Sequence, residues 1–275
     1  MTNNLADIEC FVFDMDGTIY LEDKLISGSL ELFKYLNENN IKYYFLTNNS
    51  SKTAEAYLKK LHSLSIDFIE LSQIITSGDI TIEYIKERFN KPNVYLVGTD
   101  DLKTDFIKSG INVVGEYGED IDAVVIGFDT SFNYEKAAIA TRYIRKGIPF
   151  ISTHLDLVCP IKNREFIPDC GSITKMIEYS TDTEAKYIGK PCEETVKFLI
   201  DRVKLSKDKI AIVGDRLYTD VATGVNNGMT GIAVLTGETS LEEIKKSSIN
   251  PTFVFKSINE LYISIKDSRY NFNIM

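Results

Sequence analysis

The stretch FVFDMDGT, residues 11–18, decides how this chain folds, because an apolar run stops there at two carboxylates. Residues 8–13 predict a short strand that is buried on both faces, and Gly17 signals the turn that ends it. Beyond such a strand Asp14 and Asp16 can share one space, which is unfavourable unless a cation or a reaction uses them. An Asx-type turn that merely closes the strand is the alternative interpretation.

The bulk composition indicates a globular protein that does not bind polyanions nonspecifically. The 275 residues are 44% hydrophobic and 26% charged, enough for one large domain or two modest ones. The net charge of -9 argues against nonspecific binding to nucleic acid or to an anionic membrane. We therefore expect neither nucleic acid nor a membrane as a partner.

The cysteines and the first residues bear on location. The four cysteines show no CxxC spacing and are expected to be reduced thiols, as in a reducing compartment. Zinc is disfavoured because the chain has only two histidines and neither lies near a cysteine pair. Residues 1–9 show no signal-peptide pattern, and no apolar run reaches membrane-spanning length. A cytoplasmic protein is expected.

Strand-like and helix-like segments alternate along the chain, which predicts an α/β fold with a parallel sheet. Strands are expected at residues 8–13, 41–46, 94–97, 123–126, 148–151, 185–188, 210–213 and 232–235, with an edge strand at 251–255. Helices are expected at residues 29–39, 54–61, 80–88, 134–145 and 193–204. A loop-rich stretch, 152–171, precedes a short helix with Ile173, Met176 and Ile177 facing inward.

The positions of the polar clusters predict two domains. The clusters occupy the first fifth and the last third of the chain and are missing from its middle. We therefore expect a core formed by residues 1–79 and 183–275, interrupted by an inserted domain at residues 80–182.

Four predicted core strands end in a polar group. The groups are Asp14 with Asp16, Thr47-Asn48-Asn49, Gly189-Lys190-Pro191, and Gly214-Asp215 followed by Asp220. Ligands of open parallel sheets bind beyond the carboxyl ends of the strands, so the four groups are expected to meet in one crevice.

Two of these groups suit an anionic ligand. Thr47 offers a hydroxyl, and the turn at Asn48 and Asn49 offers backbone N–H groups before a helix, which favours phosphate. Helix capping by Ser50 or Ser51 is the simpler role for this segment and is compatible with it. Lys190, although most lysines are solvated, would hold a phosphate if it lies at a buried strand end.

The other groups favour a divalent cation. Asp215 and Asp220 bring the expected crevice to four carboxylates, which would repel one another without a counter-charge. Mg²⁺ prefers oxygen ligands and pairs with substrate phosphate, and no histidine occurs in any of the four groups.

Taken together, the four groups resemble the four motifs of the haloacid dehalogenase (HAD) superfamily of phosphohydrolases. The details are similar to the NagD-like, or 4-nitrophenylphosphatase, subfamily, which carries a large α/β cap between its second and third motifs. The subfamily marks are residues 47–51 (TNNSS), 127–129 (GFD), 152–156 (STHLD), 170–172 (CGS) and 189–191 (GKP). The resemblance implies a Rossmann-like parallel-sheet core with an inserted α/β cap domain that selects the substrate.

The resemblance also implies residue roles. Asp14 would attack phosphorus to form an aspartyl-phosphate, and Asp16 would act as general acid and then base. Asp14, Asp215 and the Asp16 carbonyl would bind Mg²⁺, and Asp220 would support them or orient Lys190.

The phosphate-binding roles would belong to Thr47, Asn48, Asn49 and Lys190. In the cap, relatives usually have Asn where this chain has His154. We expect His154 and Asp156 to face the substrate, with packing in a loop as the alternative for His154. His62 is expected to be solvated.

The resemblance implies an Mg²⁺-dependent phosphatase of small phosphorylated metabolites. Phosphotransfer, as in sugar mutases of the superfamily, and a phosphate-binding regulatory role without turnover are the alternatives. The large cap argues against the first, and the intact pair Asp14 and Asp16 against the second. A true dehalogenase is disfavoured because Asp16 would have no role. Sugar phosphates, nucleotides and related phosphomonoesters stay open as substrates, and a homodimer is left open.

Overall fold

The computed structural model describes residues 4–118, 120–161 and 165–272, which form two compact units. Residues 4–46, 58–75 and 196–272 make up the first unit, and Thr47–Tyr57 with Thr76–Thr195 make up the second. The division expected from the sequence, with 80–182 as a substrate-selecting cap, stays a prediction.

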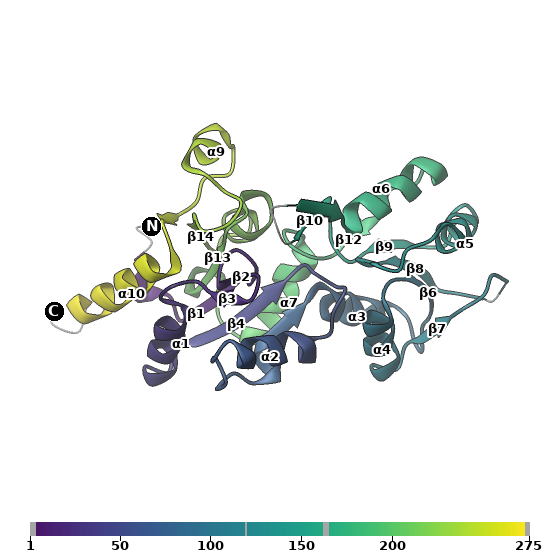
Figure 1. Cartoon of the computed structure of the whole chain (residues 1–275). Coiled ribbons are helices and arrows are strands. Elements are labelled where there is room, and N and C mark those ends of the chain that lie inside the picture. Colours follow the sequence, from purple (N-terminus) through teal and green to yellow (C-terminus); the bar gives the residue numbers. More distant parts are fainter. Residues whose placement is uncertain (1–3, 119, 162–164, 273–275) are drawn as a thin grey trace. The chain divides into compact units, whose positions relative to one another are not determined.

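The first unit is built on a six-stranded sheet in the order β15-β14-β13-β1-β4-β5. Figure 1 labels its strands β1, β4, β13 and β14. Strand β1 pairs in parallel with β13 and with β4, and β14 pairs in parallel with β13 and β15. The strands are β1 (Cys10–Phe13), β4 (Lys42–Thr47), β5 (Ile74–Thr76), β13 (Ile210–Gly214), β14 (Thr230–Val234) and β15 (Phe253–Phe255), and a small hairpin adds β2 (Tyr20–Leu21) and β3 (Lys24–Leu25).

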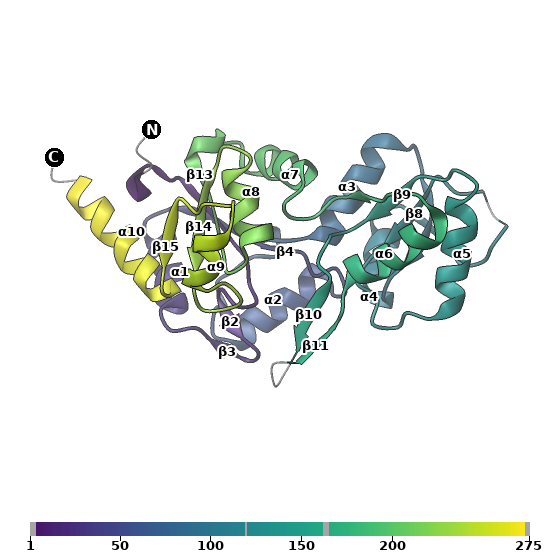
Figure 2. The same cartoon turned by 90° about the horizontal axis from the view of Figure 1, so that it is seen from above.

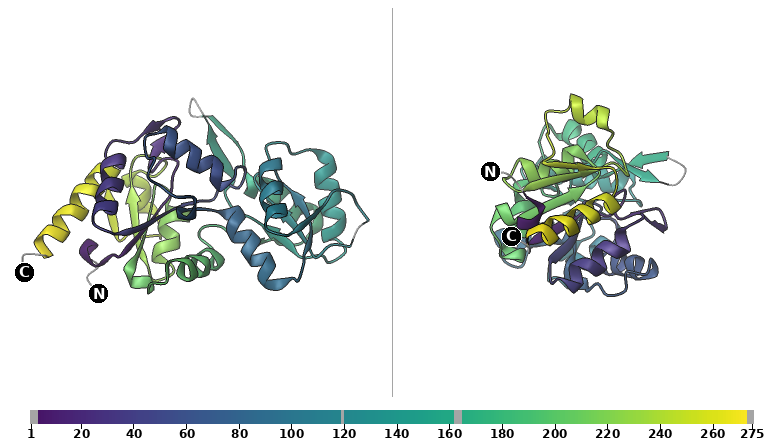
Figure 3. Two further views of the ribbon diagram at one scale, coloured as in Figure 1. Left: turned by 90° about the horizontal axis from the view of Figure 1, so that it is seen from below. Right: turned by 90° about the vertical axis from the view of Figure 1, so that its left-hand side faces the viewer.

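Helical segments accompany this sheet. The helix α8 packs on β13 and β14, whereas α10 packs on β15 and α1. Figures 2 and 3 show α10 in yellow beside α1. The segments are η1 (Leu5–Asp7), α1 (Ser29–Glu38), α2 (Ala54–Ser63), η2 (Leu71–Gln73), α7 (Glu193–Val203), η4 (Lys207–Lys209), the π-helical turn η5 (Leu217–Val221), α8 (Ala222–Val225), α9 (Leu241–Lys246) and α10 (Ile258–Phe272).

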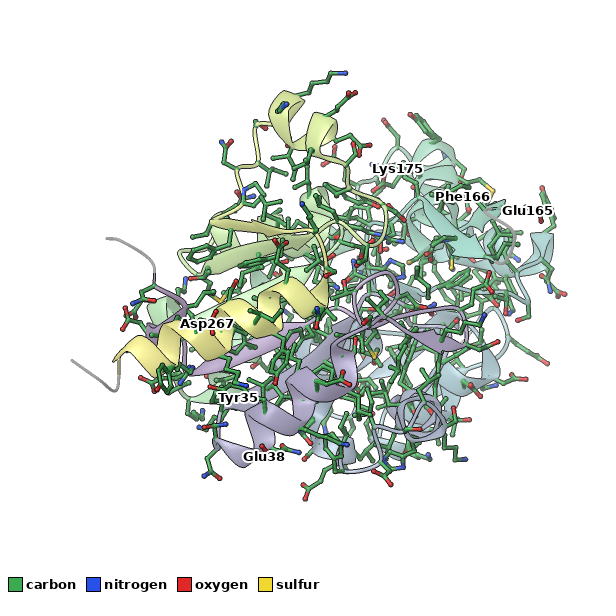
Figure 4. All side chains as sticks on the ribbon, turned by 60° about the vertical axis from the view of Figure 1, so that its left-hand side comes forward. Tyr35, Glu38, Glu165, Phe166, Lys175 and Asp267 are labelled. Carbon is green, nitrogen blue, oxygen red and sulfur yellow. The ribbon has the colours of Figure 1, made fainter. Side chains whose placement is uncertain are left out.

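The apolar run before Asp14 forms the centre of this core. All four residues of β1 are buried, as expected for a strand covered on both faces. Phe13 meets Phe33 of α1 edge-on, with ring centroids 5.1 Å apart, and Phe33 also packs on Phe45 of β4. At the periphery Tyr35 of α1 lies next to α10, where its ring contacts Tyr262 (Figure 4).

The second unit is built on a five-stranded parallel sheet in the order β12-β9-β8-β6-β7. Its strands are β6 (Asn93–Val97), β7 (Asn112–Val114), β8 (Ala123–Ile126), β9 (Phe150–Ser152) and β12 (Lys186–Tyr187), with an antiparallel hairpin of β10 (Val158–Ile161) and β11 (Glu165–Pro168). Its helices are α3 (Ser77–Arg88), α4 (Asp100–Lys108), α5 (Tyr134–Ile144) and α6 (Cys170–Thr181).

One sheet assignment expected from the sequence is wrong. The strand expected at residues 185–188 pairs as β12 with β9 of the five-stranded sheet, and the N–H groups of Ile188 and Gly189 continue this pairing by donating to Ser152 and Thr153. Lys190 therefore does not follow a strand of the six-stranded sheet. A strand this short carries no mark in its sequence of the sheet that it joins.

Several local expectations also need correction. The stretch 152–171 holds the hairpin of β10 and β11, although residues 162–164 lie outside the described residues. Glu165 and Phe166 of this hairpin are exposed (Figure 4). Met176, expected to face inward on α6, is 45% exposed, whereas Ile173 and Ile177 are buried. Strands β5 and β7 and helix α4 were not expected, because their apolar runs are short or interrupted by charge.

Within the described residues, no helix combines the length and the apolar character needed to cross a membrane.

Candidate active site

The turn after β1 is shaped by a glycine. The Asp14 N–H donates to the carbonyl of Val213 (2.8 Å). The hydrogen bonding between β1 and β13 therefore continues as far as Asp14. Gly17 then adopts a φ of +86°, a conformation that other residues rarely take. A Cβ atom at Gly17 would lie 2.5 Å from Oδ2 of Asp215, so the turn also needs glycine in order to approach that carboxylate.

Three carboxylates meet in the first unit. Asp14, Asp215 and Asp220 each offer a carboxylate oxygen, and these oxygens lie within 4.8 Å of one another. Asp215 follows β13, and Asp220 lies in the π-helical turn η5, a type of turn frequent at functional sites. The structure thus brings together the side chains of the first and fourth motifs.

The electrostatics of this group are unfavourable without a counter-charge. Asp215 and Asp220 are each only 1% exposed. Burial, and then the negative charge of Asp220, raise the pKa of Asp215 to about 7. An ion that neutralises the group would remove this conflict.

Backbone groups hold the two buried carboxylates in place. Asp215 accepts hydrogen bonds from the N–H of Glu238 (2.8 Å) and from the hydroxyl of Thr18 (3.3 Å). Asp220 accepts one from the N–H of Arg216 (3.0 Å). The guanidinium of Arg216 in turn pairs with the Glu238 carboxylate at 2.7 Å, which ties the loop after β13 to the loop after β14.

The loop after β14 is a part of the site that the sequence interpretation missed. The hydroxyl of Thr236 donates to the carbonyl of Gly17 (2.6 Å), and a Cβ atom at Gly237 would collide with the carboxylate of Asp215. The sequence did contain a signal: the strand expected at 232–235 also ends in a polar, glycine-containing turn, beside the strand that carries Asp215.

The donor set of this group fits a hard divalent cation. All three side chains offer oxygen atoms, and the two glycine positions leave no room for side chains against Asp215. Oxygen-only ligation by carboxylates is typical of Mg²⁺ and Mn²⁺ sites and atypical of zinc sites.

Asp16 stands apart from the buried carboxylates. Its side chain is 49% exposed, and one oxygen lies 3.6 Å from the ammonium of Lys60. The other oxygen accepts a hydrogen bond from the hydroxyl of Tyr20 (3.3 Å), and the same ammonium lies 3.7 Å from the Tyr20 ring centroid. Lys60 and Tyr20 therefore flank an accessible carboxylate, and neither was singled out from the sequence.

In the second unit, the segment after β4 is held by its own side chains. The Thr47 hydroxyl accepts from the N–H of Asn49 (3.1 Å), and the Asn49 side chain accepts from the N–H of Ser51 (2.9 Å). The hydroxyl of Ser77 donates to the Asn48 carbonyl. Some amides of this turn are thus already used within the segment.

The helix cap lies later than expected. Helix α2 begins at Ala54, and the Thr53 hydroxyl accepts from the N–H of Ala56 (3.1 Å), which is an N-cap contact. The expected capping by Ser50 or Ser51 is wrong, because the Ser50 hydroxyl instead contacts the Thr153 hydroxyl (3.0 Å) and accepts from Phe128 N–H.

Asn48 and Lys190, predicted from separate motifs, do meet. The Asn48 amide nitrogen donates to the Lys190 carbonyl (3.1 Å), and its amide oxygen accepts from the Lys190 N–H (2.8 Å). The same amide nitrogen donates to Oδ2 of Asp156 (3.1 Å). All three residues are at least 94% buried.

His154 and Asp156 lie in the loop between β9 and β10. His154 is fully buried, with Asp156 and Asp169 on either side of its ring. His62, in contrast, is exposed, and its Nε2 lies 3.1 Å from the Ile69 carbonyl.

The neighbouring parallel strands β1 and β13 lead into this carboxylate cluster, and comparison with known proteins identifies the class of protein. Residues 11–112 match a haloacid dehalogenase-like hydrolase family, and residues 187–261 match a second HAD-hydrolase-like family. The chain belongs to the haloacid dehalogenase-like hydrolases.

Individual relatives narrow this assignment. An acid sugar phosphatase of Staphylococcus haemolyticus is 38% identical over 249 residues, 90% of this chain and 93% of that protein. The solved 4-nitrophenylphosphatase of Thermotoga maritima has 42% identity and a TM-score of 0.90, covering 95% of this chain and 98% of that one. NagD of E. coli K-12 has 25% identity and a TM-score of 0.84, covering 92% and 98%. The chain is a NagD-like phosphatase, an enzyme that hydrolyses phosphoesters.

Proposed function

We propose that this phosphatase is Mg²⁺-dependent and hydrolyses small phosphorylated metabolites through an aspartyl-phosphate on Asp14. The observation that carries the proposal is the convergence of Asp14, Asp215 and Asp220 within 4.8 Å, with the pKa of Asp215 raised to about 7 by burial and by the negative charge of Asp220. Mg²⁺, held by Asp14, Asp215 and the Asp16 carbonyl, would neutralise these carboxylates and the phosphoryl charge. Asp220 would support Asp215.

The proposed reaction has two steps. A carboxylate oxygen of Asp14 forms a bond to phosphorus while the bond to the leaving oxygen breaks, and the Asp16 carboxyl gives its proton to that oxygen. Water then attacks phosphorus, Asp16 takes the proton, and the bond between Asp14 and phosphorus breaks. The exposure of Asp16 beside Lys60 supports this role, since a general acid must reach solvent and substrate.

Thr47, Asn48, Asn49 and Lys190 would bind the transferring phosphoryl group. The double contact between Asn48 and Lys190 supports the proposal, because it fixes both residues to one another. Residues 80–182 would act as the substrate-selecting cap.

Sugar phosphates are the first substrate class to test. The Staphylococcus relatives are acid sugar phosphatases, at 36–38% identity. Nucleotides and other phosphomonoesters are the competing classes. Transfer of the phosphoryl group to a second sugar hydroxyl, instead of to water, is the second candidate reaction.

The test is release of 4-nitrophenol from 4-nitrophenyl phosphate by the protein with Mg²⁺, with a chelator, and as Asp14→Asn. We expect turnover that the chelator abolishes and that Asp14→Asn reduces by at least roughly 1000-fold. Asp67→Asn, an exposed carboxylate of the same unit, is the matched control and should keep full activity.

Turnover that persists in Asp14→Asn would refute the covalent mechanism. A panel of sugar phosphates and nucleotides, scored both for free phosphate and for transferred phosphate, then separates hydrolysis from phosphotransfer.

The free cysteines agree with the expected reducing, cytoplasmic location, which stays a proposal. A homodimer also stays open, and sedimentation of the purified protein decides it.

A further inference from the structure

A histidine enclosed between two carboxylates lies in the second unit. His154 is fully buried in the loop that joins β9 to β10. Its Nδ1 lies 3.5 Å from Oδ2 of Asp156, and its Nε2 lies 3.5 Å from Oδ1 of Asp169. Neither ring nitrogen has a hydrogen-bond partner at normal distance within the described residues. The ring is thus held by charge on both sides.

The surroundings of His154 favour the charged imidazolium. Burial opposes the charge, but the Cys170 sulfur and the carboxylates of Asp169 and Asp156 outweigh it and raise the pKa of His154 to about 9. A neutral imidazole has one N–H and can face only one carboxylate as a donor, whereas the imidazolium faces both. The geometry, with one carboxylate at each ring nitrogen, matches the charged form.

The two carboxylates are themselves fixed. Asp169 is the N-cap residue of α6 and accepts from the N–H of Cys170 (2.6 Å). The carbonyl of Asp156 accepts from the N–H of Gly171 (2.8 Å). His154 therefore joins the start of α6 to the loop that carries Asp156.

Asp156 connects His154 to Asn48, one of the proposed phosphate-binding residues. The oxygen that faces His154, Oδ2, also accepts from the amide nitrogen of Asn48 at 3.1 Å. Asn48 in turn brackets the backbone of Lys190 through its carbonyl and its N–H. A continuous path of contacts runs from Asp169 through the histidine and Asp156 to Asn48 and Lys190.

The backbone next to Lys190 has no room to shift. A Cβ atom at Gly189 would lie 2.7 Å from Oδ1 of Asn48 and 2.9 Å from Cβ of His154. The N–H of Gly189 also donates to the carbonyl of Thr153 (2.8 Å). A change in the position of His154 would therefore reach Asn48 both through Asp156 and through this tight packing.

We propose that His154 is a positioning residue, which bridges Asp156 and Asp169 and thereby fixes the Asn48 amide and the Lys190 backbone for phosphate binding. This inference rests on the proposed function for the role of Asn48 and Lys190. In this proposal His154 supports the phosphate-binding residues and does not contact the substrate, in contrast to the expectation from the sequence.

The first test measures the protonation state of His154 and does not depend on enzymatic activity. The chain has two histidines, so His62→Asn leaves His154 as the one imidazole in the ¹⁵N NMR spectrum. We expect Nδ1 and Nε2 both to be protonated at pH 7.5, with a titration midpoint near 9. A neutral imidazole at pH 7.5 overturns the bridge, as would a divalent cation bound at the histidine.

The second test measures whether a change at His154 affects phosphate binding through Asn48. In His154→Asn, we expect the affinity for inorganic phosphate, measured by competitive inhibition, to fall roughly tenfold, because Asp156 loses the charged neighbour that faces its Oδ2. The affinity for Mg²⁺ should not change, because its carboxylates lie in the first unit. His62→Asn is the matched control and should alter neither affinity.

A double-mutant cycle separates this path from general damage. If His154 acts through Asp156, the variant with both His154→Asn and Asp156→Asn should bind phosphate no more weakly than Asp156→Asn alone. Losses that multiply, or an unchanged phosphate affinity in His154→Asn, overturn the proposal. His154→Gln, checked by thermal unfolding, repeats the measurement if the asparagine variant does not fold.

The outcomes also separate this inference from the proposed function. If the native protein binds no phosphate and shows no turnover, the proposed function fails. The NMR spectrum still decides whether His154 is the charged bridge between the two carboxylates.

Discussion

Among the residues that the structure describes, two groups of three potential metal ligands lie close together, and the charges within the two groups differ. Asp14, Asp215 and Asp220 bring only negative charge, whereas the group formed by His154, Asp156 and Asp169 contains a histidine that can supply the opposite charge. Buried like charges raise one another's pKa unless something neutralises them. In the second group His154 places one positive charge between two carboxylates, whereas we propose a cation for the first.

A cluster of carboxylates is therefore not by itself evidence for a metal. The two groups are alike in the closeness of their ligand atoms. They differ in the charges of their side chains, and from this difference we propose a metal site for the first group and a positioning role for the second.

The largest effect is expected from a substitution that fills the space beside the Asp215 carboxylate. Gly237→Ala would push a methyl group into the Asp215 carboxylate, so the Mg²⁺ concentration for half-maximal activity should rise by roughly 100-fold or more. Mg²⁺ titration of 4-nitrophenyl phosphate hydrolysis measures this.

Gly115→Ala is the matched control, since a Cβ atom there meets nothing within 4 Å. An unchanged Mg²⁺ requirement in Gly237→Ala would mean that Asp215 is not a ligand, and the contrast between the two groups would be lost.

The charge within the second group should appear as a pH dependence of stability. The pKa of His154 is raised in the folded protein from its ordinary 6.5 to about 9, so its contribution is complete below pH 6.5 and is lost as the pH rises through 9. By linkage the free energy of unfolding should fall by about 3 kcal/mol over this window on account of His154.

Urea denaturation at several pH values measures this fall, and His154→Asn should lack it. Asp215, whose pKa is also raised, titrates in both proteins, so only the difference between them belongs to His154. Parallel curves for the two proteins would show that the second group carries no buried positive charge.

The smallest effect is expected from removing the positive charge of Lys60 beside Asp16. Lys60→Met removes the ammonium 3.6 Å from Asp16, and kcat should fall by roughly threefold, because a pair exposed to this degree is worth only about 0.2–1 kcal/mol. The decrease should shrink at high salt, which screens such pairs.

Lys59→Met, at an exposed neighbouring position, should leave kcat unchanged. A loss as large as that of Asp14→Asn would instead mean that Lys60 takes part in the chemistry directly.

Much of the fold could be predicted from local pattern. The apolar runs before Asp14 and Asp215 are long, uninterrupted and followed by turn residues, so both strands and both carboxylates were found where the structure has them. The carboxyl-end rule for parallel sheets then sufficed to predict that Asp14, Asp215 and Asp220 meet.

Two predictions from the sequence were wrong, because they depend on contacts between residues that are distant in the sequence. Lys190 follows a two-residue strand whose partner is chosen by pairing with β9, which no local pattern records. Thr53, and not Ser50 or Ser51, caps α2, because tertiary contacts to Thr153 and Phe128 occupy the Ser50 hydroxyl.

Short motifs at strand ends and apolar periodicity were sufficient to predict the family, the α/β class and the meeting of Asp14, Asp215 and Asp220. The folded structure was needed to show which sheet precedes Lys190, that glycines make room for Asp215, and that His154 lies between Asp156 and Asp169. The physical reason is that charge neutralisation and close packing depend on neighbours in space, and those neighbours are set when the whole chain has folded.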